Sequence, residues 1–540
     1  MAIKVAFIGA GSVGFTRRLT LDMLTVSELQ DTHFSYHDID DGNLERVARL
    51  VRKDLKANRV PARLTTHRDR RAALDGADYV INCTRIGGLE AFATDIDIPL
   101  KYGVDQCVGD TLCAGGIMYG QRNIPCVLEF QSDMVELCNH HRPGGPLFLN
   151  YANPMAMNTW ASVDAYTRGE GIATVGLCHG VEGGWRQIAD ALSRFHGEPE
   201  AMEVPSDAEE WIERNPHRRL VDIAAAGINH QTWYVTILYK GRGVGPEELL
   251  AAFESHPSLT ATEKVRIDVL RRFGVYSTES NGHLSEYLPW YRKRPHETRD
   301  WIDLSSWING ETGGYLRVCT EGRNWFVSDY PRWLEEAGGP IRACDRSSEH
   351  GSYIIEALET GRIYRGHFNV RNNGVISNLP DDCIVEAPGF VDRSGIHMTA
   401  GIRLPQACAA TCAASVNVQR MAVDAARSGD VLLLKQAMLH DPLVGAVCNP
   451  EEVWQMTDEM LLAQASWLPQ YVARGAIDAA RERLATAEQD GSRVALRDWR
   501  GAARVDPKPV DTLRSTPDTS IMEADKSNTG KSRGNSRSND

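Results

Sequence analysis

The stretch "KVAFIGAGSVGF", residues 4–15, joins a short apolar run to three closely spaced glycines. The apolar run is typical of a buried strand, and a helical pattern begins at about residue 17. Gly9, Gly11 and Gly14 therefore lie where a strand turns into a helix. Glycines at this point allow a tight turn, in which helix N-terminal amides hold the pyrophosphate of a dinucleotide. The alternative is a domain in which the glycines only make the turn.

The residues that follow alternate between strand patterns and helical patterns. Apolar, β-rich runs lie at residues 33–40, 77–88, 146–154 and 172–178, and a charged amphipathic helix is predicted at 43–59. This alternation predicts an α/β fold with a Rossmann-like, doubly wound parallel sheet. Asp38 ends the second strand, where a carboxylate accepts from a ribose hydroxyl and favours NAD over NADP. Asp40 only begins the next loop, and Ser12 is counted with the cofactor-binding glycines.

The order of elements changes beyond residue 190. Residues 218–240 read as strands, the region after them is mixed and largely helical, and 451–472 is a late amphipathic helix. We therefore expect four segments: a Rossmann-like domain at 1–190, a mixed α+β substrate and oligomerisation domain at 191–475, a helical extension at 476–505 and a disordered tail at 506–540. The tail is rich in Ser, Thr, Asn and Lys and poor in apolar residues.

Composition excludes several classes of protein. The net charge of −13, from 59 basic and 72 acidic residues, argues against nucleic-acid binding. The N terminus lacks the features of a signal peptide, and no apolar run approaches the roughly 20 residues that span a bilayer. We therefore expect no membrane partner and a cytoplasmic location. Twelve scattered cysteines favour reduced thiols over a disulfide framework.

Polar residues with chemical potential cluster after the later strands. Asn150 and Asn153 follow one strand, where open α/β sheets bind ligands, and Asn153 either holds a sugar hydroxyl or caps the next helix. Cys178 and His179 follow the next strand, and His230 lies further on. A thiolate and an imidazole suit a divalent transition metal, but a buried cysteine with hydrogen-bonded histidines has the same spacing.

Two further stretches are open to two interpretations each. Residues 272–291 concentrate aromatic side chains, including Tyr276 and Tyr287, which form either a core or a site in which a tyrosine near a cation acts as a base. Residues 369–374, "NVRNNG", read as a turn. Its Arg371 either clamps a substrate or makes a surface ion pair.

Together these stretches resemble glycoside hydrolase family 4, the NAD- and Mn-dependent glycosidases, and most closely its bacterial α-galactosidase branch. The resemblance runs from about residue 4 to about residue 470. It is carried by "FIGAGSVGF", "DYVINCTRIGG", "DTLCAGGIM", "NYANPMAMNTW", "GLCHG", "AGINH", "TESNGHLSEYLPW" and "NVRNNGVISNLP". It implies an α-galactosidase of the retaining type, acting on a small α-linked glycoside, and a homodimer or homotetramer.

The resemblance also implies a mechanism and residue roles. NAD takes a hydride from C3 of the sugar, which acidifies the C2 proton. A tyrosine removes that proton, the glycosidic oxygen leaves, water adds and the hydride returns, unlike the two-carboxylate mechanism of most glycosidases. Mn²⁺ or another divalent ion, held by Cys178 and His230, stabilises the enolate. Tyr287 is the expected base, with Tyr276 second, and His179 assists the leaving group.

The remaining roles concern the substrate pocket. The resemblance places Asp110 near the reacting groups and assigns substrate contacts to Asn153 and Arg371. Two positions depart from the α-galactosidase branch. Gly180 stands where that branch usually has serine, and glycine at this position is a feature of uronic-acid-specific branches. Cys113 and Ala114 stand where relatives commonly read Gly-Pro. An α-glucuronidase or α-galacturonidase and an NAD-dependent sugar dehydrogenase are therefore the alternatives. A cofactor-binding regulatory protein without turnover is a third.

Overall fold

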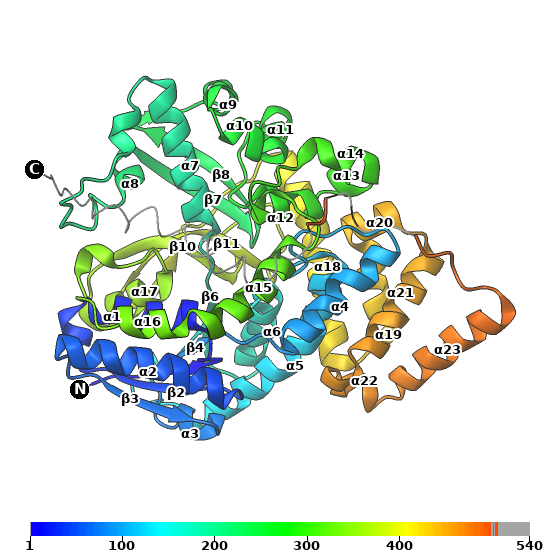
Figure 1. The fold of residues 1–540 in the computed structure, drawn as a ribbon, viewed down its shortest axis with the longest axis horizontal. Coiled ribbons are helices and arrows are strands. Elements are labelled where there is room, and N and C mark those ends of the chain that lie inside the picture. Colours follow the sequence, from blue (N-terminus) through cyan, green and yellow to red (C-terminus); the bar gives the residue numbers. More distant parts are fainter. Residues whose placement is uncertain (1, 498–500, 502, 506–540) are drawn as a thin grey trace, which may run out of the picture.

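One mixed sheet forms the centre of the molecule in the computed structural model, which describes residues 2–497, 501 and 503–505 (Figure 1). In these residues the sheet has 12 strands, in the order β3-β2-β1-β4-β5-β6-β10-β11-β7-β8-β9, with β12 paired to β11. The first six strands are mutually parallel, and their order is that of a dinucleotide-binding fold. The α/β, Rossmann-like prediction is confirmed.

The strands divide into a parallel and an antiparallel group. The parallel strands are β1 (Lys4–Ile8), β2 (His33–His37), β3 (Arg63–His67), β4 (Tyr79–Asn82), β5 (Leu147–Asn150) and β6 (Ala173–Gly176). The antiparallel strands are β7 (Val221–Ile228), β8 (Gln231–Tyr239), β9 (Arg242–Gly243), β10 (Tyr364–Arg371), β11 (Ile384–Asp392) and β12 (Gly395–Met398).

Helices cover the parallel strands on both faces. They are the π-helical turn η1 (Val13–Arg17), α1 (Arg18–Leu24), η2 (Ser27–Leu29), α2 (Asp41–Asn58), α3 (Arg70–Leu74), α4 (Gly88–Lys101), α5 (Cys113–Leu137), α6 (Met155–Thr167) and α7 (Gly180–Phe195). The Asp40 side chain caps α2 by accepting from the amide of Asn43, which accounts for its place after the strand.

Short helices dominate the middle of the chain. They are η3 (Pro199–Met202), α8 (Pro216–Leu220), α9 (Pro246–Ser255), α10 (Leu259–Thr262), α11 (Lys264–Phe273), α12 (Asn281–Tyr287), α13 (Pro289–Arg292), α14 (Pro295–Thr298), η4 (Arg299–Trp301), η5 (Trp307–Asn309), α15 (Gly314–Ser328), α16 (Tyr330–Glu336), η6 (Ala343–Asp345) and α17 (His350–Thr360). Prolines stand in the first turn of many of these helices, where their missing amide costs nothing.

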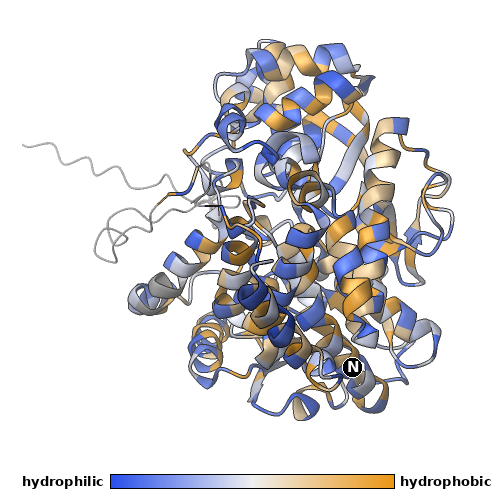
Figure 2. Ribbon diagram, turned by 90° about the vertical axis from the view of Figure 1, so that its right-hand side faces the viewer, coloured by the Kyte–Doolittle hydropathy of each residue, from blue (hydrophilic) through white to orange (hydrophobic). Residues whose placement is uncertain are grey.

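Longer helices return at the end of the described chain and pack beside α4 and α5 (Figure 1). They are α18 (Gln406–Ser428), α19 (Val431–His440), α20 (Pro442–Val447), α21 (Pro450–Ala463), η7 (Ala465–Trp467), α22 (Pro469–Val472) and α23 (Ala476–Asp490). Hydrophobic and hydrophilic residues alternate along the helices, as expected of amphipathic helices that cover a core (Figure 2). No helix in the described ranges is both long and apolar enough to cross a bilayer.

Three larger hydrophobic clusters fill the interior. One lies around β1 and β2, one joins α5 and α6 to α18–α21, and one lies between α7, β7 and α9. Strands on both sides of residue 190 belong to one sheet, because β10 pairs with β6 at Asn369 and Gly176. The predicted domain boundaries stay a prediction, and the tail at 506–540 lies outside the described residues.

One local prediction is wrong. Residues 369–374 do not form a turn throughout: 369–371 end β10, and the reversal begins only at 372. Residues 369–371 continue β10, but the Asn-Asn-Gly sequence at 372–374 is typical of a turn and hides this continuation. Asn373 and Gly374 adopt positive φ angles of 39° and 83°, which these residue types tolerate at a turn.

Candidate active site

Four parallel strands end at one edge of the sheet in a single row. Ile8 of β1, Asn82 of β4, Asn150 of β5 and Gly176 of β6 are neighbours in register. The glycine turn, Asn153 and Cys178 each follow one of these ends, so chain topology alone brings them to the same crevice. Strand order reverses at β1, and the crevice outside such a reversal is where α/β sheets bind ligands.

The glycine turn is shaped by backbone contacts that leave no room for side chains. Gly9 has a φ of +84°, and a β-carbon there would lie 2.8 Å from the carbonyl carbon of Cys83. A β-carbon at Gly11 would meet the Asp38 carboxylate at 2.8 Å, whereas nothing lies within 4 Å of one at Gly14. Gly9 and Gly11 thus serve the fold of the turn, and Gly14 faces open space.

Asp38 already binds the turn itself. Its carboxylate accepts from the amide of Gly11 at 2.7 Å and from the amide of Asp40 at 2.9 Å. The carboxylate is thereby fixed at the end of β2, in the position that a ribose would approach. Ser12 precedes the π-helical turn and makes no side-chain capping bond.

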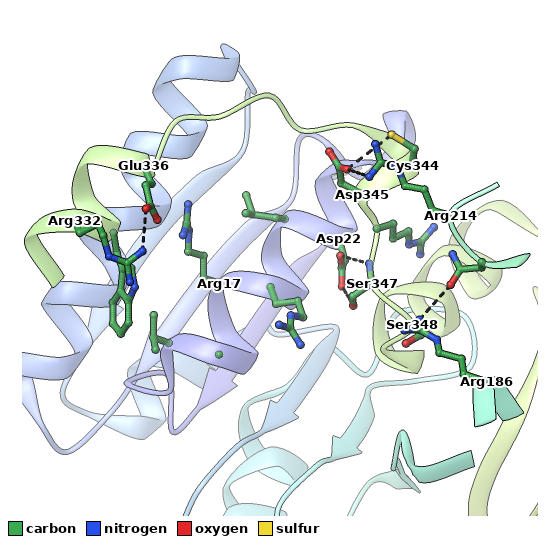
Figure 3. Close-up of a pocket in the computed structure, with 17 residues that line it drawn as sticks. Arg17, Asp22, Arg186, Arg214, Arg332, Glu336, Cys344, Asp345, Ser347 and Ser348 are labelled. Carbon is green, nitrogen blue, oxygen red and sulfur yellow. Dashed lines mark hydrogen bonds and ion pairs between the residues drawn. The ribbon is translucent and has the colours of Figure 1, made fainter. Parts of the chain in front are cut away.

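A cavity of about 390 Å³ opens beside Gly14 (Figure 3). Its lining contains six arginines and three acids, namely Arg17, Arg18, Arg186, Arg214, Arg332 and Arg346 with Asp22, Glu336 and Asp345. Ion pairs such as Arg332 with Glu336 and Arg214 with Asp345 hold part of this charge (Figure 3). Arg17 and Arg346 pair with Asp54 and Glu356, which lie outside the lining, so acids neutralise much of the positive charge of this cavity.

Cys178, His230 and Glu279 converge at the same edge. The Cys178 thiol lies 3.3 Å from His230 Nε2 and 3.8 Å from Glu279 Oε1, and His230 Nε2 lies 3.7 Å from Glu279 Oε1. His230 and Glu279 are buried, and Cys178 is half-buried. Burial raises the pKa of the Cys178 thiol well above its usual range. We call these three residues the CHE cluster.

His230 owes its place to a tight hairpin turn between β7 and β8, in which it has a φ of +63°. The ring is oriented from behind by Thr111. The Thr111 hydroxyl donates to Asp110 Oδ1 at 2.9 Å and lies 2.8 Å from His230 Nδ1. Because the hydroxyl proton goes to the carboxylate, Nδ1 must donate, and the lone pair of Nε2 faces Cys178 and Glu279.

Asp110 is the anchor of this chain of hydrogen bonds. Its second oxygen accepts from the Asn153 amide at 2.7 Å, and His283 Nε2 lies 3.8 Å from the first. Burial alone would raise the pKa of Asp110, but its interaction with His283 and the nearby positive charges hold that pKa below its usual range. Asn153 therefore orients Asp110 through its amide nitrogen, while its Oδ1 accepts from the amide of Met155, the first residue of α6, at 3.3 Å.

Tyr287 and Tyr276, the two candidate bases, have different surroundings. The Tyr287 ring lies 5.9 Å from that of His283, which in turn lies 4.5 Å from that of His230. Its buried hydroxyl has no hydrogen-bond partner of good geometry among the described residues, and burial raises the pKa of Tyr287 well above its usual range. Tyr276 instead packs in the third hydrophobic cluster and donates to Gln187 at 3.1 Å.

The remaining predicted residues fall in different places. His179 begins the turn into α7, its side chain is 56% exposed, and its Nδ1 lies 3.4 Å from Glu349. Arg371 is not brought to the CHE cluster. It pairs with Asp164 of α6 at 3.6 Å, roughly 14 Å along that helix from its N terminus. A substrate role for Arg371 finds no support in this arrangement.

Cys113 and Ala114, one of the two departures from the galactosidase branch, lie in the hydrophobic interior where α5 begins. The Cys113 amide donates to Asp441 at 3.0 Å. Both residues therefore act on the packing of α5.

A row of polar side chains crosses the floor of the site. Asn369 of β10 lies between Gly176 of β6 and Glu386 of β11, and Glu386 in turn pairs in register with Gly227 of β7. Both amide atoms of Asn369, both of Asn229 and Oε1 of Glu386 are buried without a well-formed hydrogen bond in the described part of the chain. Unsatisfied buried polar atoms at a crevice are suited to a ligand rich in hydroxyl groups.

Sequence reasoning missed three of the residues that build this site. Thr111 lies in the stretch "DTLCAGGIM", and Glu279 and His283 lie in "TESNGHLSEYLPW", but neither composition nor spacing assigns them a role. Only the approach of the 277–283 segment to the end of β6 brings Glu279 to Cys178.

Comparisons with known proteins agree with this geometry. A model described as "Family 4 glycosyl hydrolase" matches residues 4–194, and one for the C-terminal domain of that family matches residues 225–444. The chain is 58% identical to an α-galactosidase of Rhizobium meliloti, over 97% of this chain and 99% of that protein. It is 31% identical to an α-galactosidase of Bacillus subtilis, over 87% and 99% respectively.

A solved structure shares the fold. The 6-phospho-β-glucosidase of Thermotoga maritima, solved with manganese, NAD⁺ and glucose-6-phosphate, superposes with a TM-score of 0.64 at 21% identity. The alignment covers 86% of this chain and 99% of that one.

Proposed function

Because the chain belongs to family 4 of the glycosyl hydrolases, we propose that it is an NAD- and Mn²⁺-dependent α-galactosidase. The observation that carries this proposal is a single edge of the sheet that holds both a cofactor-type glycine turn and the CHE cluster. An ordinary dehydrogenase needs only the first, and an ordinary two-carboxylate glycosidase needs neither.

The residues of the glycine turn fit a dinucleotide. Gly9 has a backbone conformation that glycine favours, and a β-carbon at Gly14 would occupy empty space beside the arginine-lined cavity. Gly9, Gly11, Ser12 and Gly14 would let the pyrophosphate approach the turn closely, and the first amides of the π-helical turn, which begins at Val13, would bind it. Asp38 would accept from a ribose hydroxyl, which favours NAD.

The CHE cluster fits a divalent ion by its donor chemistry. Cys178 and His230 present sulfur and nitrogen atoms 3.3 Å apart, and the hydrogen bond from Nδ1 leaves Nε2 free to bind. When bound, NAD would accept a hydride from C3 of the sugar and return it, and Mn²⁺ would polarise the oxygens of the sugar. The orphaned polar atoms of Asn369 and Glu386 would then bind further hydroxyl groups.

The chain's own residues supply the proton transfers. Tyr287 would remove the proton at C2, because its ring lies 5.9 Å from that of His283 and its buried hydroxyl makes no well-formed hydrogen bond within the described part of the chain. Burial raises the pKa of Tyr287 well above its usual range, so it requires positive charge nearby to act as a base. His179, exposed at the mouth, would donate to the departing oxygen. Asp110 and Asn153 would act by orienting Thr111 and His230.

Sequence similarity and the surroundings of Arg371 favour a neutral sugar. The chain is 58% identical to an α-galactosidase over 97% of its length. Arg371, the residue expected to bind an anionic group, pairs instead with Asp164. A galactoside is therefore favoured over the uronide alternative. A cytoplasmic location and a dimeric or tetrameric assembly stay predictions.

A panel of aryl α-glycosides tests the proposal. The enzyme, freed of bound cofactor, is assayed on α-galactoside, α-glucoside and α-galacturonide with and without NAD and Mn²⁺. We expect hydrolysis of the galactoside only when both cofactors are present. Equal hydrolysis in chelator without NAD would contradict the mechanism, and a preference for the galacturonide would contradict the substrate. Accumulation of NADH without cleavage would identify a sugar dehydrogenase.

A further inference from the structure

Gly180 lies directly against the Glu279 carboxylate. A β-carbon at position 180 would meet Glu279 Oε1 at 1.7 Å and Cδ at 2.8 Å, both far inside contact distance. Gly180 is the first residue of α7, where the backbone is helical and accepts any residue. Backbone conformation therefore does not require glycine here. Space does, and the group that needs the space is the carboxylate.

Glu279 is held so that one oxygen faces the cluster. Oε2 lies 3.3 Å from His283 Nδ1 and accepts from the amide of Ser280 at 3.3 Å. Oε1 lies 3.7 Å from the unprotonated Nε2 of His230 and accepts from the Cys178 thiol at 3.8 Å. The side chain is 9% exposed, so solvent screens it little.

Three donor atoms thus face one another in a buried site, with the thiol proton of Cys178 directed at Glu279. A divalent ion that displaced this proton would meet lone pairs from all three residues. The three separations are 3.3, 3.8 and 3.7 Å. Four-coordinate ions with bonds of about 2.0–2.3 Å hold their donors about 3.3–3.8 Å apart, and six-coordinate ions hold adjacent donors somewhat closer. The separations match those of three ligands of one ion.

We propose that Glu279 is a third protein ligand of the divalent ion and that Gly180 is the residue that admits it. This inference rests on the proposed function, which needs only Cys178 and His230 at the metal. An added carboxylate oxygen shifts a sulfur and nitrogen site toward harder ions, because Mn²⁺ prefers oxygen donors. The glycine at position 180 then follows from the metal site rather than from a uronic-acid substrate.

Metal binding by the apo-enzyme tests the role of Glu279. Mn²⁺ alone is titrated into chelator-treated protein, and free Mn²⁺ is measured by electron paramagnetic resonance. We expect Glu279→Ala and the nearly isosteric Glu279→Gln to raise the Kd for Mn²⁺ by more than about tenfold, with a smaller rise for Zn²⁺. Glu349→Gln is the matched control, since this buried carboxylate contacts His179 and should leave both values unchanged.

A double-mutant cycle tests the role of Gly180. Gly180→Ser should weaken Mn²⁺ binding as much as Glu279→Ala does, because the new side chain displaces the carboxylate. In the Glu279→Ala background, the same substitution should cause no further loss. Circular dichroism on each variant verifies that the fold is retained.

The outcomes separate this inference from the proposed function. Tight Mn²⁺ binding by the unaltered enzyme with an unchanged Kd in Glu279→Ala and Glu279→Gln would overturn the third ligand only. Equal losses from Gly180→Ser in both backgrounds would overturn the coupling of the two positions. Failure of the unaltered enzyme to bind Mn²⁺ at all would contradict the proposed function together with this inference.

Discussion

The Thr111 hydroxyl decides which nitrogen of His230 faces the CHE cluster. Its proton is committed to Asp110, so it can only accept from His230 Nδ1. The lone pair of Nε2 is thereby directed at Cys178 and Glu279. A residue with no contact to the substrate thus fixes the tautomer that metal binding requires.

Replacing Thr111 by valine should therefore weaken metal binding. Valine keeps the shape of threonine but removes both hydrogen bonds, so Nε2 no longer carries a fixed lone pair. We expect the Kd for Mn²⁺ to rise about 10–100-fold, as is usual for groups that orient a ligating histidine. Thr111→Ser keeps the hydroxyl and serves as the control. An unchanged Kd in the valine variant would refute this account of the tautomer.

Tyr287→Phe should separate catalysis from stability. The hydroxyl lost from Tyr287 has no well-formed hydrogen bond in the described residues, so the temperature of unfolding should not fall. Turnover of an aryl α-galactoside should fall about 10²–10⁴-fold, the usual contribution of a general base. In contrast, Tyr276→Phe removes only a hydrogen bond to Gln187 and should leave turnover nearly intact. The reverse ranking would make Tyr276 the base.

At the residue scale, the sequence could predict what lies at strand ends and little else. Cys178 and Asn153 follow strands whose register the alternation pattern implies. Glu279 could not be found, because the 277–283 segment approaches β6 through tertiary packing that no local pattern records. The ion pair that Arg371 makes could not be assigned either, because its partner Asp164 lies on α6, about 200 residues earlier in the chain.

At the scale of elements, the glycine turn separates two uses of glycine. Gly9 is needed by the backbone, since its positive φ and its contact with Cys83 exclude a side chain. No contact among the described residues requires glycine at position 14, since none of their atoms lies within 4 Å of its hypothetical β-carbon. The spacing of the glycines could be read from the sequence, but this difference between them could not.

Alanine at each position should distinguish these uses. Gly9→Ala should lower the free energy of unfolding by about 1 kcal/mol or more and also weaken NAD binding. Gly14→Ala should leave the unfolding temperature unchanged and weaken NAD binding alone, because its methyl group fills the space for the pyrophosphate. Calorimetric titration of NAD with thermal unfolding measures both. Undiminished NAD affinity in Gly14→Ala would place the pyrophosphate elsewhere.

At the scale of the whole molecule, the sheet joins the two halves of the chain. The β7–β8 hairpin was predicted as strands, but its place in the same sheet was not. Strand patterns record which residues are extended and not which strands pair across 190 residues of sequence. As a result, the strands β6, β10, β11 and β7 lie side by side between Cys178 and His230. Asn369 lies on β10 and Glu386 on β11, the two middle strands of this row.

A buried ion pair between α4 and α5 also binds the C-terminal helices through Gln464. Arg122 of α5 binds both oxygens of Asp95 in α4, at 2.8 and 2.6 Å, and also Gln464 after α21, at 2.6 Å. Both charged side chains are 1% exposed. Arg122→Ala leaves Asp95 buried and unpaired, so we expect a loss of about 3–5 kcal/mol in stability.

Thermal or denaturant unfolding measures this loss. Arg481→Ala, which breaks the exposed pair with Asp478 on α23, is the control and should change little. A loss no larger than that of the control would show that the helices are held by hydrophobic packing alone.

The central claim is that cleavage proceeds through removal of the C2 proton and not through direct displacement at C1. Hydrolysis of an aryl α-galactoside in heavy water with NAD and Mn²⁺ tests it directly, with the released galactose examined by nuclear magnetic resonance. The account predicts deuterium at C2 of the product, because C2 loses its proton during elimination and takes a deuteron from the solvent when water adds. Galactose released at full rate with only protium at C2 would contradict it.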